Sequence, residues 1–138
     1  MNFKKVTLSG LAGGVVFFVI GNLFYYAFQG LYMTDAMAAL WKEMPMPGWI
    51  IQLFVVNLVI GLLLAALYDV FGNTLEHTAC KKGAIFGLLF GIFYALTHGL
   101  TEWLLFNIPT SMHVLGFVEN LVAFAATGAA IAFVYEKV

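Results

Sequence analysis

The sequence contains no arginine, and all six of its basic residues are lysines. A nucleic-acid-binding surface needs lysine and arginine side chains clustered on one face, and the sequence has no such cluster. The guanidinium fork is also the usual partner of phosphate and carboxylate groups, because it holds them through two parallel hydrogen bonds. The sequence therefore argues against nucleic acid as a partner and against strongly anionic ligands.

Cysteine is equally scarce, since Cys80 is the only one in the chain. An intrachain disulfide and a cluster of thiolate metal ligands are therefore excluded. Cys80 follows His77 in an isolated H-x-x-C pattern, which is a weak metal half-site. We interpret this stretch as an ordinary polar loop.

Charged residues make up only 9% of the chain, whereas apolar residues make up 63%. Soluble domains carry about 25% charged residues, so this composition indicates an integral membrane protein in contact with the lipid bilayer. We expect one membrane domain over residues 1–138. The membrane that we expect is the inner or plasma membrane of a bacterium or archaeon.

Long apolar stretches define the fold class, because a helix needs about 20 apolar residues to cross a membrane. Lysines or prolines bound each stretch, and no run alternates with the period of a strand. The first stretch is longer than the apolar core of a signal peptide and lacks a small-x-small cleavage site, so we expect it to be retained. The sequence predicts an all-α, polytopic protein with spans at residues 6–28, 49–71, 83–106 and 112–135.

The lysines predict the orientation of these spans. Five lysines flank one set of span ends, namely Lys4, Lys5, Lys81, Lys82 and Lys137. Only Lys42 flanks the other set, where all three tryptophans also lie. The positive-inside rule places both termini and the 72–82 loop in the cytoplasm, and tryptophan favours the opposite membrane interface. We therefore predict an N-in, C-in topology.

The outer segment between the first two spans reads QGLYMTDAMAALWKEMPMPG. Thr34 or Asp35 can cap a short amphipathic helix here, and Pro45 ends it. Such a helix can lie on the membrane surface. It either covers the outer ends of the spans or simply connects them.

The two halves of the chain resemble one another. Aligning the lysine pairs that precede spans one and three places Gly10 on Gly87. Similarly, GLLLAALYD in span two resembles GAAIAFVYE in span four, which places Gly61 on Gly128. We predict two hairpins in parallel orientation, related by an axis along the membrane normal. The predicted repeats are residues 1–72 and 80–138.

Small residues at helical spacing mark the faces through which membrane helices pack. On span four the small face carries Gly116 and Ala123, so we expect the opposite face to meet lipid. That opposite face carries Phe117, Leu121, Phe124 and Ile131. On span three the small stripe Gly87, Gly91, Ala95 continues into His98 and Glu102, and we therefore expect both polar side chains to point inward.

The polar residues of the second hairpin fall at matching depths. At about 1.5 Å per residue, Glu102 lies level with His113 near the outer rim, and His98 lies level with Glu119 farther in. A buried carboxylate costs at least about 2.5–3.5 kcal/mol and marks a functional site by default. We predict an outward-facing site that contains these four residues, with Gln52 and Asn57 approaching from the first hairpin.

The ligand of this site is open from sequence alone. A divalent metal held by His98, Glu102, His113 and Glu119 is one candidate. Haem is not expected, because two axial histidines should face each other at similar depth, whereas His98 and His113 differ by about one turn.

The sequence is compatible with three functions. The first is a non-enzymatic protein, forming a homo-oligomer, that binds or transports a cation, a proton or a small polar solute. The second is an accessory subunit of a larger membrane complex, such as an electron-transfer assembly, in which the Glu and His side chains act as hydrogen-bonded pins between helices. An enzyme is the least favoured, because the sequence offers no nucleophile within an arranged triad.

Overall fold

The computed structural model describes residues 2–35, 48–75 and 77–138, and all regular secondary structure in these ranges is helical. The long helices are α1 (Phe3–Ala27), α4 (Trp49–Phe71), α5 (Ala79–Tyr94) and α7 (Thr110–Lys137). The short elements are α2 (Gln29–Tyr32), η1 (Gly72–Thr74), η2 (Ala95–Gly99) and α6 (Leu100–Leu105). The turn η2 is a π-helix, and it joins α5 to α6 in one continuous rod.

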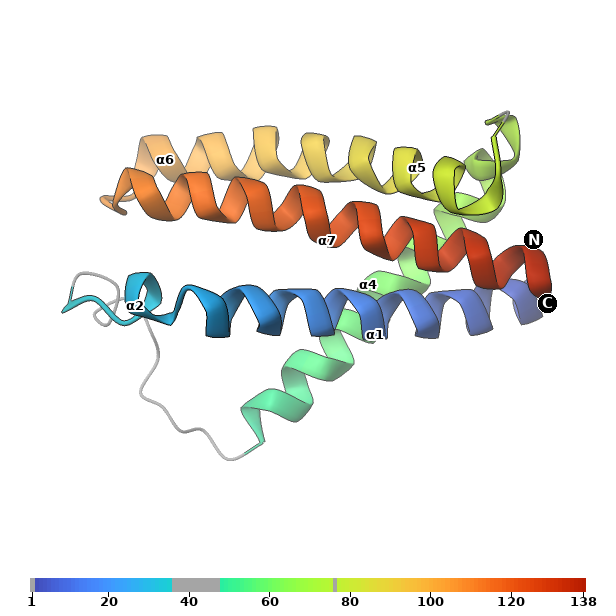
Figure 1. Ribbon diagram of the computed structural model, residues 1–138, viewed down its shortest axis with the longest axis horizontal. Helices are drawn as coiled ribbons and strands as arrows, with labels where there is room; N and C mark the ends of the chain where they lie inside the picture. The colour runs from blue at the N-terminus through green and yellow to red at the C-terminus, as the bar shows by residue number, and fades with distance from the viewer. Residues whose placement is uncertain (1, 36–47, 76) are drawn as a thin grey trace.

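Four helices are long and apolar enough to cross a membrane, which confirms the predicted all-helical, membrane-spanning class. Helix α4 has the predicted bounds of 49–71, and the other spans begin and end within a few residues of prediction. Both termini lie at one end of the molecule (Figure 1). The side of the membrane that this end faces stays a prediction. The expected amphipathic outer helix falls mainly on residues 36–47, outside the described ranges.

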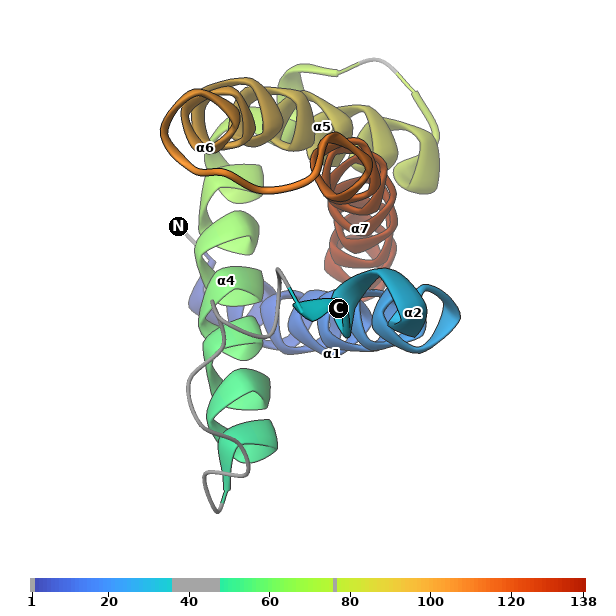
Figure 2. The same ribbon diagram turned by 90° about the vertical axis from the view of Figure 1, so that its left-hand side faces the viewer.

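Helix α7 lies between α1 and α5 and packs against both (Figures 1 and 2). Its two flanks are therefore covered, and the expectation that one whole flank meets lipid is wrong. Phe124 and Ile131 are buried, with Ile131 at 0% exposure. Only Phe117 of the predicted lipid-facing set is as exposed as expected, while Leu121 is half-buried.

Helix α4 crosses α1 steeply and then diverges from the other helices toward its Trp49 end (Figure 2). Its buried residues follow one stripe that begins near the middle of the helix and faces α1 and α7. These residues are Asn57, Gly61, Leu64, Ala65 and Tyr68. The first half of α4 therefore contributes little to the core.

Glycines bring the helix backbones into direct contact in both hairpins. A Cβ atom on Gly61 would lie 2.3 Å from the carbonyl oxygen of Gly10, and one on Gly128 would lie 2.1 Å from that of Gly83. No real Cβ fits at such distances, so only glycine permits these contacts. In these contacts Gly10 takes the place in the first hairpin that Gly83 takes in the second. The sequence alignment had paired Gly10 with Gly87, which lies one helical turn away. The parallel repeat stays a prediction.

Polar contacts join the two hairpins at the end of the molecule that carries both termini. The hydroxyl of Tyr135 on α7 donates a hydrogen bond to Asp69 on α4. The Nζ atom of Lys5 on α1 donates to the carbonyl oxygen of Tyr135 at 3.1 Å. Within the second hairpin, Lys82 forms an ion pair with Glu136. At this end, the three contacts link α1, α4 and α5 to α7, so all four long helices are joined.

We expect Gly61→Ala and Gly128→Ala each to lower the free energy of unfolding by about 1–3 kcal/mol, because the added methyl group forces two backbones apart. Unfolding in detergent, followed by circular dichroism, measures this loss. Gly116→Ala is the matched control, since among the described residues no atom beyond its chain neighbours and its own helix backbone lies within 4 Å of the new methyl group. That variant should be unchanged or more stable by up to about 1 kcal/mol through helix propensity. Equal stability of all three variants would contradict the packing described.

Candidate functional site

A pocket of about 540 Å³ lies between the α5–η2–α6 rod and α7, at the end of the molecule opposite the termini. Tyr32 of α2 borders it from the first hairpin. Its polar lining residues are Tyr32, Tyr94, His98, Glu102, Thr110, His113 and Asn120. The rest of the lining is mainly apolar and includes Trp103 and Phe117. Three of the four residues predicted to form one site therefore border the same space.

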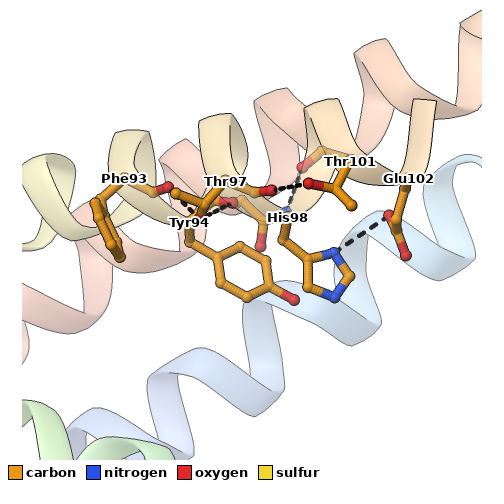
Figure 3. Close-up of polar contacts among 8 residues, drawn as sticks. Phe93, Tyr94, Thr97, His98, Thr101 and Glu102 are labelled. Carbon is orange, nitrogen blue, oxygen red and sulfur yellow. Dashed lines mark hydrogen bonds and ion pairs between the residues drawn. The ribbon is translucent and has the colours of Figure 1, made fainter. Parts of the chain in front are cut away.

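His98 and Glu102 form a pair along the rod, with 3.4 Å between Nδ1 of His98 and Oε2 of Glu102. The ring of Tyr94 stacks on the imidazole, with 5.0 Å between centroids and 20° between planes. Figure 3 shows the imidazole between the tyrosine ring and the carboxylate. The Tyr94 ring on one side and the Glu102 carboxylate on the other thus flank the imidazole.

The expectation that His98 and Glu102 point fully into the bundle is wrong. Ala95 is buried as predicted, yet the His98 and Glu102 side chains are 51% and 41% exposed. The π-helical turn Ala95–Gly99 explains this difference, because its wider turn breaks the 3.6-residue period on which the prediction rests. The pair consequently sits at the mouth of the pocket, within reach of ligands from outside the bundle.

Two threonines on the exposed flank of this turn are satisfied within their own helix (Figure 3). The hydroxyl of Thr97 donates to the carbonyl oxygen of Phe93 at 2.7 Å, and that of Thr101 donates to the carbonyl oxygen of Thr97 at 2.6 Å. These hydroxyls need no partner outside the helix. The imidazole of His98 and the carboxylate of Glu102 are thus the polar groups here that can bind a ligand.

His113 approaches the pocket from the first turn of α7. Its Nε2 atom is buried and has no hydrogen-bond partner among the residues that the structure describes. A buried polar atom of this kind costs about 1–3 kcal/mol unless a partner satisfies it. Because this atom is fully buried, a ligand in the pocket does not contact it unless neighbouring side chains move.

Glu119 does not reach His98, which corrects the predicted convergence of these two residues. Its Oε2 atom accepts a 2.7 Å hydrogen bond from the hydroxyl of Tyr32. Its Oε1 atom lies 3.7 Å from where a Cβ on Gly21 would stand. Glu119 thus faces α1 and α2, whereas the neighbouring Asn120 borders the pocket. Because α7 lies between α1 and α5, one of its faces carries Glu119 and another borders the pocket.

Gln52 and Asn57 also lie away from the pocket, because α4 diverges from the second hairpin. Asn57 is buried at the α1–α4 crossing, and its Nδ2 atom donates to the carbonyl oxygen of Leu53 at 2.6 Å. Gln52 is exposed on the diverging half of α4. Neither residue lines the pocket.

The predicted metal site lacks a complete ligand set. Within residues 2–35, 48–75 and 77–138, no three histidine, cysteine, aspartate or glutamate side chains are grouped so that they could hold a metal ion. His98 and Glu102 form a pair, while Glu119 binds Tyr32 instead. The described residues therefore fit a protein-ligated metal poorly.

Tyr32 is the functional candidate that the sequence did not reveal. Burial, and then the hydrogen bond to Glu119, raise the pKa of its hydroxyl above the ordinary value. The hydroxyl therefore stays protonated and remains a donor at every physiological pH. The two partners are 87 positions apart, and no local spacing links them.

Comparison with protein-family models, curated proteins and solved structures gives no match to this chain.

We expect Tyr32→Phe to lower the free energy of unfolding by about 1–3 kcal/mol, because Glu119 then lies half-buried without its donor. Unfolding in detergent measures the loss. Tyr26→Phe removes the same atom from a ring that is 68% exposed and should have no effect beyond about 0.5 kcal/mol. In the Glu119→Gln background, Tyr32→Phe should cost less, since no charge is left unpaired. Equal effects in both backgrounds would refute the proposed role of this bond.

Proposed function

We propose that this protein binds a cation or a small polar solute in the pocket between the α5–η2–α6 rod and α7, and transports it. The observation that carries this proposal is the His98–Glu102 pair at the mouth of the pocket. Among the residues that the structure describes, Glu102 is the only carboxylate that lines the pocket, and no lysine of that set lines it. A carboxylate that is paired only with an imidazole, in a largely apolar space, attracts positive charge.

The lysine distribution supports an outward-facing pocket. Most lysines lie at the end of the molecule that carries both termini, and the pocket lies at the other end. By the positive-inside rule the ligand then enters from the non-cytoplasmic side. Binding of the ligand is non-covalent, and the protein is proposed as a non-enzymatic one.

A second candidate is an accessory subunit of a larger membrane complex. It is favoured by α4, whose first half diverges from its neighbours and presents exposed apolar side chains on several sides. A partner helix could fill the space beside it. In this case the polar pairs of the second hairpin act mainly as pins between helices.

We expect Glu102→Gln to raise the Kd for a bound cation about tenfold or more, because a charged partner worth roughly 1.5–3 kcal/mol is lost. Calorimetric titration of the purified protein with a panel of monovalent inorganic and organic cations measures binding. Uptake into proteoliposomes tests transport, and it should fall with binding.

Glu136→Gln makes the same chemical change at the opposite end of the molecule, where Glu136 pairs with Lys82. This control should leave the affinity for the cation unchanged. Binding that is equally strong in wild type and Glu102→Gln would overturn the proposed site.

A different result is expected if the protein is an accessory subunit of a larger membrane complex. Native mass spectrometry of the protein extracted gently from its membrane should then show foreign subunits in fixed stoichiometry. A particle that contains only copies of this chain, and that binds cations through Glu102, would exclude it.

A further inference from the structure

The lining of the pocket is mostly hydrocarbon, which restricts the chemistry of its ligand. Apolar side chains from the rod and from α7 form most of its wall, namely Leu96, Leu100, Trp103, Met112, Val114 and Phe117. A volume of about 540 Å³ lies within the range of roughly 300–1,000 Å³ typical of pockets for small organic molecules. One water occupies about 30 Å³ in the liquid. A bare inorganic cation would leave most of this apolar space unfilled.

Aromatic rings border the space beside the carboxylate. Tyr94 stacks on His98, and Trp103 and Tyr32 also line the pocket. Aromatic faces attract organic cations through the ring quadrupole, most strongly where water is excluded. These rings and Glu102 therefore favour the same ligand charge.

The mouth of the pocket opens on a face of the molecule that is itself apolar. Leu100, Trp103 and Val114 line the pocket and are 50%, 54% and 59% exposed. In a bilayer this face meets acyl chains, so a ligand with apolar groups can approach from the membrane. A strongly hydrated ion would have no such route.

The carboxylate of Glu102 can bind an N–H group in this setting, because an ionised carboxylate accepts hydrogen bonds. The Nε2 atom of His113 is fully buried, so a ligand in the pocket does not contact it. A protonated amine offers up to three donors to the carboxylate.

From this combination we infer that the pocket takes an amphiphilic organic amine: a protonated nitrogen bound by Glu102, with an aromatic or aliphatic body against Tyr94 and Trp103. This inference rests on the proposed function and names its ligand class. The carboxylate selects the charge, and the apolar wall selects the body. Each half of the ligand can be tested separately.

Three probes separate these contributions in the purified full-length protein, reconstituted in lipid nanodiscs. The probe 2-phenylethylammonium carries both the charge and the apolar body. Methylammonium keeps the charge alone, and 2-phenylethanol keeps the body alone. We expect 2-phenylethylammonium to bind at least tenfold more tightly than either of the others, as measured by calorimetry with empty nanodiscs subtracted.

Variants then assign the contacts. Glu102→Gln should weaken binding of 2-phenylethylammonium about tenfold and leave that of 2-phenylethanol unchanged, whereas Glu102→Asp should retain the preference for the charged probe. Tyr94→Leu should weaken the charged aromatic probe more than methylammonium. Circular dichroism of each variant establishes that the helices are retained.

The outcomes of these experiments distinguish the amphiphilic ligand class from the cation site of the proposed function. If methylammonium or sodium binds as tightly as 2-phenylethylammonium and depends on Glu102, the cation site stands and the amphiphilic ligand class is overturned. If 2-phenylethanol binds as tightly as the amine, the role of charge is overturned. If no cation binds, or if binding ignores Glu102, both the inference and the proposed function fail.

Discussion

The fold depends on helix backbones that touch through glycine. Gly61 packs on the backbone of Gly10, and Gly128 packs on that of Gly83, so each hairpin contains close backbone contacts that admit no side chain. Water does not drive helices together inside a bilayer, and close packing has to supply the attraction instead. These contacts fix the separation of the helices in each hairpin. The pocket at the α2–α6 end exists because α5 and α7 are held by glycines nearer the other end.

Hydropathy and breaker residues predicted the four spans closely, because both depend only on local sequence. The bounds of α4 agree with the predicted 49–71 stretch, where glycine and proline precede the helix and Gly72 ends it. Small-residue stripes correctly indicated Gly10, Gly14 and Gly87 as contact positions. They could not reveal that α7 is covered on two sides, since a stripe marks one packing face and says nothing of a second neighbour. The burial of Phe124 and Ile131 follows from tertiary arrangement alone.

The candidate site was predicted only in part, for two physical reasons. The π-turn Ala95–Gly99 shifts His98 and Glu102 relative to the preceding stripe, and a constant helical period cannot anticipate it. Tyr32 and Glu119 meet across the two hairpins, and depth estimates along single helices contain no information on azimuth. Equal depth was therefore a sound guide for Glu102 and His113, which border one pocket. It was misleading for His98 and Glu119, whose predicted levels coincide but whose side chains face different neighbours.

Tyr32 belongs to two structures at once, since it borders the pocket and its hydroxyl binds Glu119 on α7. A molecule that pushes the phenol ring aside must also disturb the bond between the hairpins at this end, while Asp69 and Tyr135 still join them at the other. By thermodynamic reciprocity, if occupancy of the pocket weakens the Tyr32–Glu119 bond by a given factor, breaking that bond changes the affinity of the pocket by the same factor. Tyr32 is thus the side chain through which such a coupling between the pocket and the two hairpins would run.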